Sequence, residues 1–216
     1  MAADVARAVR WARDNAPRLG ADPSRLLLCG HSAGAHLAAI VATDPRFLEA
    51  VGMATTDLEG VVGISGPYSV RMLVEETSAF VSFAVRFQAI YHAFGRDRAL
   101  WELSDPGRAA AEAARRRAAG GGEGGAGAGA GAAGAVARPA FVLLIGEKEV
   151  QQSMFEAQMR SLAEALKASG HDVRTAMVPG KSHTTMVSHL GAGAGRDTIS
   201  PLFLPRFGVS SSARRA

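Results

Sequence analysis

Hydrophobic residues of this chain fall alternately into short continuous runs and into stretches with helical spacing. The short runs are bounded by Gly, Pro or Asp, which is typical of buried strands; they cover residues 25–29, 60–65, 140–146 and 171–178. Helical spacing predicts helices over residues 2–19, 35–43 and 45–53 and after residue 150, where one apolar stripe ends at Gly170. That stripe consists of Met154, Met159, Leu162, Ala163 and Leu166. Strands that alternate with helices predict a parallel sheet and an α/β fold.

Residues 107–138 interrupt this pattern. Ala and Arg give way to Gly-Ala repeats between Gly120 and Gly134, and such a composition cannot bury enough apolar area to order itself. We therefore expect residues 107–138 to form a disordered surface insertion within a single domain of residues 1–207. Residues 208–216 are expected to be a disordered tail.

Composition narrows the possible functions of the chain. Its 216 residues carry a net charge of +4, and the arginines are scattered rather than gathered on a helix face with aromatics, which argues against nucleic-acid binding. Cys29 is the single cysteine; it fits a reducing, intracellular compartment and is expected to be an inert thiol inside a buried strand. The longest apolar stretch, 79–94, is broken by polar side chains, so no membrane span is predicted. A signal peptide is not predicted either, because the first residues contain no apolar segment.

The stretch Gly30-His31-Ser32-Ala33-Gly34 joins the first predicted strand to a helix. A strand, a sharp turn with Ser at its tip and a helix form the nucleophile elbow of α/β-hydrolases; an ordinary Gly-Ser turn is the alternative. We expect both glycines to be required where strand and helix approach closely, and Ser32 to hold a strained backbone angle. The turn would expose the Ser32 hydroxyl and place the Ala33 amide at a helix N-terminus, where it can donate to an oxyanion.

A Ser hydroxyl is a weak nucleophile unless a base takes its proton. His183 follows the last predicted strand and precedes an expected helix, which is the place for that base. The other histidines are less well placed: His31, His36, His92, His171 and His189. The acid should follow the strand 140–146, where Glu147 and Glu149 are both candidates. Spacing from the strand end favours Glu149, and the order Ser, acid, His is that of the α/β-hydrolases.

Aromatic residues at helical spacing follow between residues 80 and 94. They form either the core stripe of a helix or the lining of an apolar pocket above Ser32. The candidate substrate-binding residues are Tyr68, Phe83, Phe87 and Trp101. No cofactor and no metal site are predicted, because the histidines lack ligand spacing and the Gly-Ala tract lacks the Lys-Ser/Thr end of a phosphate-binding loop.

Several stretches resemble one subgroup of the α/β-hydrolases. Residues 31–37 are similar to the elbow of the arylformamidases and isoprenylcysteine methylesterases, and residues 63–68, 104–106 and 180–184 resemble the methylesterase branch. The resemblance covers most of the chain outside the Gly-Ala tract and the tail. It implies hydrolysis of a methyl ester on a prenylated cysteine or a similar apolar ester, small or part of a lipidated peptide. It also implies a cytoplasmic location or association with internal membranes.

Two features depart from this family. Glu149 stands where the family has Asp, so its longer side chain must reach His183 from a shifted backbone or rotamer. The chain also opens on the helix that leads to the elbow, without the His-Gly-Gly-type loop that supplies a second oxyanion donor. We therefore expect an N-terminally truncated hydrolase domain with an exposed sheet edge. Two alternatives to an esterase remain: an arylformamidase-like amidase with the same triad, and a catalytically inactive hydrolase-fold protein that binds an apolar ligand or a partner.

Overall fold

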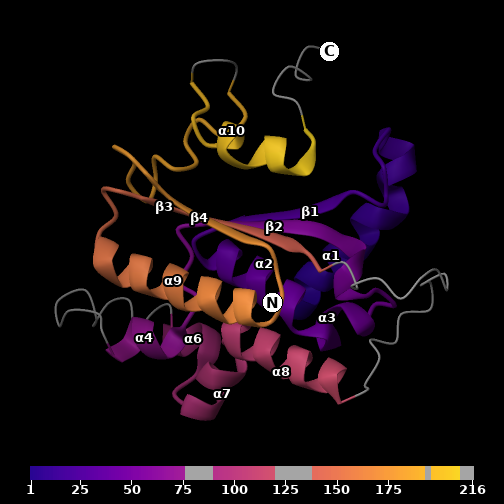
Figure 1. Cartoon of the computed structure of the whole chain (residues 1–216), viewed down its shortest axis with the longest axis horizontal. Coiled ribbons are helices and arrows are strands. Elements are labelled where there is room, and N and C mark those ends of the chain that lie inside the picture. Colours follow the sequence, from indigo (N-terminus) through magenta and orange to yellow (C-terminus); the bar gives the residue numbers. More distant parts are fainter. Residues whose placement is uncertain (76–89, 120–137, 193–195, 210–216) are drawn as a thin grey trace.

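A computed structural model describes residues 1–75, 90–119, 138–192 and 196–209 of the chain. The four predicted strands form at the expected places and belong to one sheet, with helices on both of its faces (Figure 1). In chain order the elements are α1 (Ala2–Asn15), the 3₁₀-helix η1 (Ala16–Leu19), β1 (Leu26–His31), α2 (Ala33–Thr43), α3 (Pro45–Glu49), η2 (Thr55–Asp57), β2 (Leu58–Ile64), α4 (Val70–Glu75), α6 (Tyr91–Phe94), α7 (Arg98–Leu103), α8 (Pro106–Ala118), β3 (Ala140–Gly146), α9 (Gln152–Ala168), β4 (Val173–Val178), α10 (Ser200–Phe203) and η4 (Leu204–Phe207).

The strands lie in the order β1-β2-β3-β4, and each neighbouring pair is parallel. Parallel pairs need crossover connections, and α2, α8 and α9 lie on one face of the sheet while α10 lies on the other (Figure 1). The carboxyl ends of all four strands therefore lie in one row, the carboxyl edge of the sheet. The predicted α/β class is confirmed.

Alternating side chains of the central strands fill two cores. On β3, Phe141, Leu143 and Ile145 pack in the cluster that also holds buried residues of α1, α2, α8 and α9. Val142 and Leu144 point to the opposite face and pack with buried residues of α10 and η4. Because both faces are covered, β2 and β3 read as continuous apolar runs in the sequence. The predicted stripe of α9 is also confirmed, since all five of its residues are buried.

The first strand is less buried than the sequence predicts. In the described part of the chain β1 has a neighbouring strand on one side only, which is the exposed edge expected above. Cys29 consequently lies exposed on β1, and the prediction of an enclosed core thiol is wrong. A continuous apolar run does not distinguish a central strand from an edge strand, because strand neighbours are a tertiary property.

The expectation that residues 107–138 are disordered is wrong for their first part. Residues 106–118 form α8, which begins with Asp105 as its N-cap and Pro106 at its first position. Ala110 and Ala113 are buried, and α8 contributes to the main core beside α9. Alanine has the highest helix propensity, so the Ala- and Arg-rich half of the segment differs physically from the Gly-Ala repeats. The remainder, residues 120–137, lies outside the described residues, as do residues 210–216 of the predicted tail.

Other helices differ from the prediction mainly at their ends. The first helix ends at Asn15 and continues to Leu19 as a 3₁₀ segment, where Pro17 cannot supply a backbone donor. The helix expected over residues 45–53 ends at Glu49. The segment after His183 forms turns rather than the expected helix. Among the described helices, none combines the length and the apolar composition that crossing a bilayer requires.

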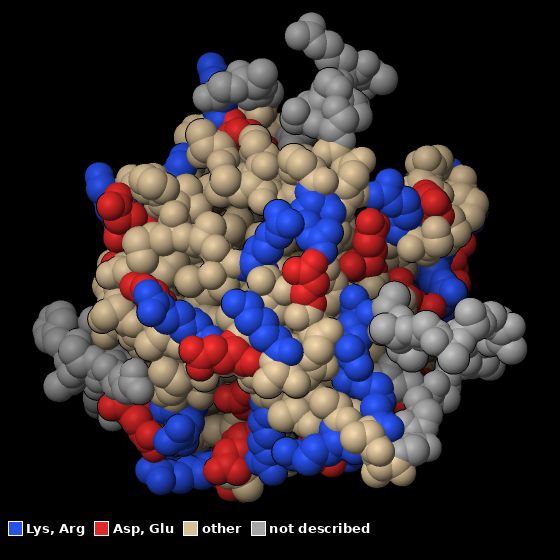
Figure 2. Space-filling model, in the orientation of Figure 1, with Lys and Arg blue, Asp and Glu red and all other residues tan. Residues whose placement is uncertain are grey.

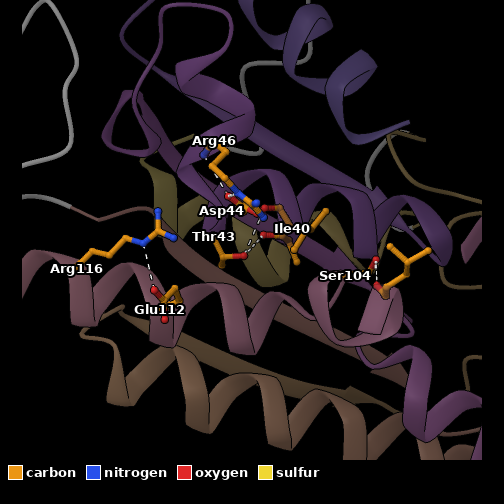
Figure 3. Close-up of polar contacts among 9 residues, drawn as sticks. Ile40, Thr43, Asp44, Arg46, Ser104, Glu112 and Arg116 are labelled. Atoms are coloured by element: carbon orange, nitrogen blue, oxygen red, sulfur yellow. Dashed lines mark hydrogen bonds and ion pairs between the residues drawn. The ribbon is translucent and has the colours of Figure 1, made fainter. Parts of the chain in front are cut away.

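A polar cluster joins the end of α2 to the start of α3 (Figure 3). Asp44, which is 4% exposed, accepts a hydrogen bond from the Arg46 amide at 3.2 Å, and its carboxylate lies 2.6 Å from the Arg46 guanidinium. Glu112 and Arg116 form an ion pair one turn apart on α8, near this cluster in the same view. Together with neighbouring residues they line a cavity of about 310 Å³ whose lining includes none of the candidate catalytic residues.

Charged residues of both signs are interspersed on the face shown in Figure 2. Arg13 lies 2.7 Å from Asp57, and Arg108 lies 2.8 Å from Glu102. Exposed pairs of this kind contribute little to stability. They agree with the charges that are scattered along the sequence.

Candidate active site

Ser32 occupies a strained turn between β1 and α2. Its φ of 55° and ψ of −124° are rarely adopted by a residue with a side chain. The Ser32 N–H donates to the Ile64 carbonyl at 2.8 Å, which ties the turn to the end of β2. Ala33 begins α2, so its N–H lies in the first turn, where helix amides have no intrahelical acceptor. The turn therefore presents a hydroxyl and an available amide side by side.

The two glycines of the elbow have different roles. A Cβ on Gly30 would collide with the backbone carbonyl of Gly34, so strand and helix can approach only if residue 30 lacks a side chain. A Cβ on Gly34 would meet no atom within 4 Å outside its own helix backbone and chain neighbours in the described structure. The expectation that both glycines serve close approach is thus correct for Gly30 and wrong for Gly34.

Gly30→Ala should destabilise the protein strongly, whereas Gly34→Ala should not. The Gly30 collision involves backbone on both sides, so relief requires moving the elbow, and we expect a loss of ~3 kcal/mol or more in the free energy of unfolding. Gly34 lies in α2, where Ala is favoured over Gly by roughly 0.5–1 kcal/mol. Urea unfolding of both variants measures these changes, and equal stability of the two variants would contradict the assignment.

Glu149 and His183 are brought together from the ends of two adjacent strands. The Oε2 atom of Glu149 lies 2.9 Å from Nδ1 of His183, and the Glu149 side chain is fully buried while that of His183 is about one-third exposed. Glu147 faces elsewhere, because its carboxylate accepts a hydrogen bond from the Gly180 amide at 2.8 Å. Of the two candidate acids, the structure therefore places Glu149 against the histidine and Glu147 on the backbone of the preceding turn.

Backbone contacts hold the loop of His183 against the end of β3. The Lys148 N–H donates to the Lys181 carbonyl at 2.7 Å. Gly146 permits this approach, since a Cβ there would collide with that same carbonyl. The loop is thus anchored at Lys181, two residues before His183.

His31 connects the elbow to the His183 loop. Its Nε2 lies 2.9 Å from the His183 carbonyl, to which it must donate, and the two rings are 4.6 Å apart. Burial, followed by the proximity of His183, lowers the pKa of His31, which favours the neutral ring at neutral pH. In the described ranges no hydrogen bond joins Ser32 Oγ to His183. His31 nevertheless places the two residues at the same edge of the sheet.

Backbone strain is concentrated at this edge. Within the described residues, the non-glycine positions with positive φ are Ser32 (55°), Ser65 (49°) and Gln151 (63°). Each follows the carboxyl end of a different neighbouring strand: β1, β2 and β3. Strained backbone persists where the surrounding structure imposes it, and it clusters at functional sites. The strained residues therefore follow the same strand ends that carry the Glu149–His183 pair.

Of the four predicted substrate-binding residues, the structure describes Tyr68 and Trp101, and both are buried. Tyr68 is 2% exposed and packs in the main core with its hydroxyl against Gly63, where burial raises its pKa. Trp101 is buried in a small separate cluster. Both line a second cavity of about 310 Å³ whose lining includes none of the three candidate triad residues. Phe83 and Phe87 lie outside the described residues.

Three further residues border the site and were missed in the sequence. Ser65 donates a hydrogen bond from its hydroxyl to Oε1 of Glu149. The ring of Phe155 on α9 lies 5.7 Å from that of His183, and His31 contacts the loop as described. Ser65 and His31 could have been found by asking which polar residues end a predicted parallel strand. Phe155 could not be found in this way, because it lies on a helix rather than at a strand end and looks like any partly buried apolar residue of an amphipathic helix. Within the described ranges, no group of three or more His, Cys, Asp or Glu side chains could hold a metal ion.

A parallel sheet with a strained serine elbow and a carboxylate–histidine pair at its carboxyl edge defines the α/β serine hydrolases. The chain belongs to the alpha/beta hydrolase fold family, whose model matches residues 1–187.

Similar proteins are esterases by name. The isoprenylcysteine alpha-carbonyl methylesterase ICME of Arabidopsis thaliana is 23% identical over 203 residues, which cover 92% of this chain and 42% of that protein. Esterase LipC of Mycobacterium tuberculosis is 36% identical over 88 residues, 38% of this chain and 22% of that protein. Inhibited esterase B from Lactobacillus rhamnosis superposes with a TM-score of 0.65 at 21% identity, over 95% of this chain and 60% of that structure. The matched regions therefore span less than two thirds of the length of each of these relatives.

Proposed function

We propose that this chain carries the catalytic residues of a serine hydrolase that cleaves carboxylic esters. Ser32 is the nucleophile, His183 the general base and Glu149 the acid of the triad. The observation that carries the proposal is the fully buried Glu149 carboxylate, 2.9 Å from Nδ1 of His183, at the same sheet edge as the strained Ser32 elbow. A buried carboxylate in this position would hold the histidine as the Nδ1–H tautomer, which leaves Nε2 free to accept a proton.

The reaction follows from these roles. Ser32 Oγ attacks the ester carbonyl as His183 Nε2 takes its proton, and the Ala33 amide donates to the oxyanion that forms. The tetrahedral intermediate collapses when His183 protonates the leaving alcohol, which gives an acyl-enzyme on Ser32. Water, deprotonated by His183, then attacks the acyl carbonyl, and the acid is released as Ser32 regains its proton. Glu149 stabilises the imidazolium at both proton transfers.

An apolar ester is the substrate we favour, with the methyl ester of a prenylated cysteine as the specific candidate. The name of the Arabidopsis relative and its alignment over 92% of this chain support that choice. We also propose an intracellular location, which the single cysteine of the chain fits. An N-formyl aryl amide is the competing substrate, since an amidase would use the same triad.

Labelling with a fluorophosphonate tests the proposal on the whole chain. We expect one covalent adduct, mapped to Ser32 by mass spectrometry, together with hydrolysis of short p-nitrophenyl esters. Prenylcysteine methyl esters and N-formyl aryl amides are then compared as substrates, and a higher kcat/KM for the amides would replace the esterase by the amidase. A folded sample that neither labels nor hydrolyses either class would show an inactive hydrolase-fold protein, and the proposal would be wrong.

A further inference from the structure

Ser65 makes a contact that the three-residue mechanism does not use. We propose that Ser65 is a positioning residue of this site, which fixes the Glu149 carboxylate so that one oxygen faces His183. The inference rests on the proposed function for its kinetic consequence, but its structural consequence can be measured without turnover.

The contacts of Glu149 divide between its two oxygens. Oε1 accepts a hydrogen bond from the Ser65 hydroxyl and lies 3.4 Å from the Gly146 amide, which also donates to it. Oε2 is thereby directed at Nδ1 of His183, 2.9 Å away. The Glu149 carboxylate is therefore held at Oε1 from the ends of β2 and β3. Only Oε2 is left to contact His183.

Ser65 is itself rigidly placed. It follows β2 directly and is 0% exposed, and its N–H donates to the Leu144 carbonyl of β3 at 2.7 Å. Its φ of 49° is a conformation that Gly would adopt at lower cost. Ser65 is strained and fully buried, and its hydroxyl donates to a carboxylate rather than to a nearby carbonyl. These features fit a role at the site better than a role in packing.

The length of the glutamate explains why such a tether is useful. Glu has one more rotatable bond than Asp, so an untethered Glu149 could turn its carboxylate away from His183. Without Ser65 the carboxylate should therefore be less well oriented towards His183.

The test compares Ser65→Ala, Ser65→Gly and Ser169→Ala. The Ala variant removes the hydroxyl and keeps the backbone strain, while the Gly variant removes both. Ser169 is a buried serine of similar kind, 5% exposed, whose hydroxyl donates to the Ala165 carbonyl at the far end of α9. We expect both Ser65 variants to lower kcat about 10-fold or more with KM unchanged. Ser169→Ala should change neither kcat nor KM.

A structural readout separates this inference from the proposed function. The Nδ1 proton of His183, observed in the downfield ¹H spectrum and assigned by its loss in His183→Ala, should shift in both Ser65 variants and stay in place in Ser169→Ala. A wild-type chain without esterase activity would refute the proposed function while this resonance still tests the tether. An unmoved resonance in folded Ser65→Ala and Ser65→Gly would overturn the inference, as would an unchanged kcat of both variants in an active enzyme.

Discussion

Ser32→Ala should lower kcat for ester hydrolysis by about four orders of magnitude or more, because the attacking oxygen is lost. Alanine has the Cβ of serine and can occupy the same strained turn, so the fold should be retained. The residual rate would come from the Ala33 amide and from substrate binding alone. Steady-state kinetics on a p-nitrophenyl ester, together with the absence of a fluorophosphonate adduct, measure the loss.

Two further variants serve as comparison and control for Ser32→Ala. Ser32→Gly should be equally inactive but more stable than Ser32→Ala, because Gly tolerates the φ of 55° without strain. Ser188→Ala, at an exposed serine outside the site, should retain full activity. Hydrolysis by Ser32→Ala at the wild-type rate would show that another residue is the nucleophile.

Glu149→Gln should lower kcat by about 10³- to 10⁴-fold with little effect on KM. The carboxylate accepts from Ser65, from Gly146 and from His183. The amide has one acceptor oxygen and adds a donor, so it must leave a buried group unsatisfied or turn a donor towards Nδ1. The second arrangement would favour the wrong histidine tautomer, with its proton on the nitrogen that should accept from Ser32.

Glu147→Gln is the matched control for this change. It replaces the neighbouring candidate acid, whose carboxylate accepts from the Gly180 amide at the surface. The amide oxygen of Gln can accept the same hydrogen bond, so activity should change less than about 3-fold and stability by under ~0.5 kcal/mol. Comparable losses of kcat in the two variants would contradict the choice of Glu149, and thermal unfolding of both excludes a general loss of structure.

Local sequence patterns were sufficient to predict the elements whose defining residues lie close together in the chain. The strands of the sheet and the stripe of α9 follow from periodicity, because a side chain's face depends only on its position within its own element. The elbow could be predicted for the same reason: strand, turn and helix occupy consecutive residues, and Ser32 adopts the expected strained conformation. The family resemblance added the fold, which the match over residues 1–187 confirms.

Tertiary structure decided what depends on neighbours distant in the chain. Cys29 is exposed because β1 lies at an edge of the described sheet, and residues 106–118 are ordered because Ala110 and Ala113 find a core to pack against. The hydrogen bond from Ser65 to Glu149 joins residues that are 84 positions apart in the sequence and meet only at the ends of adjacent strands. Periodicity says which face of an element is buried, but it carries no information about which distant side chain lies there.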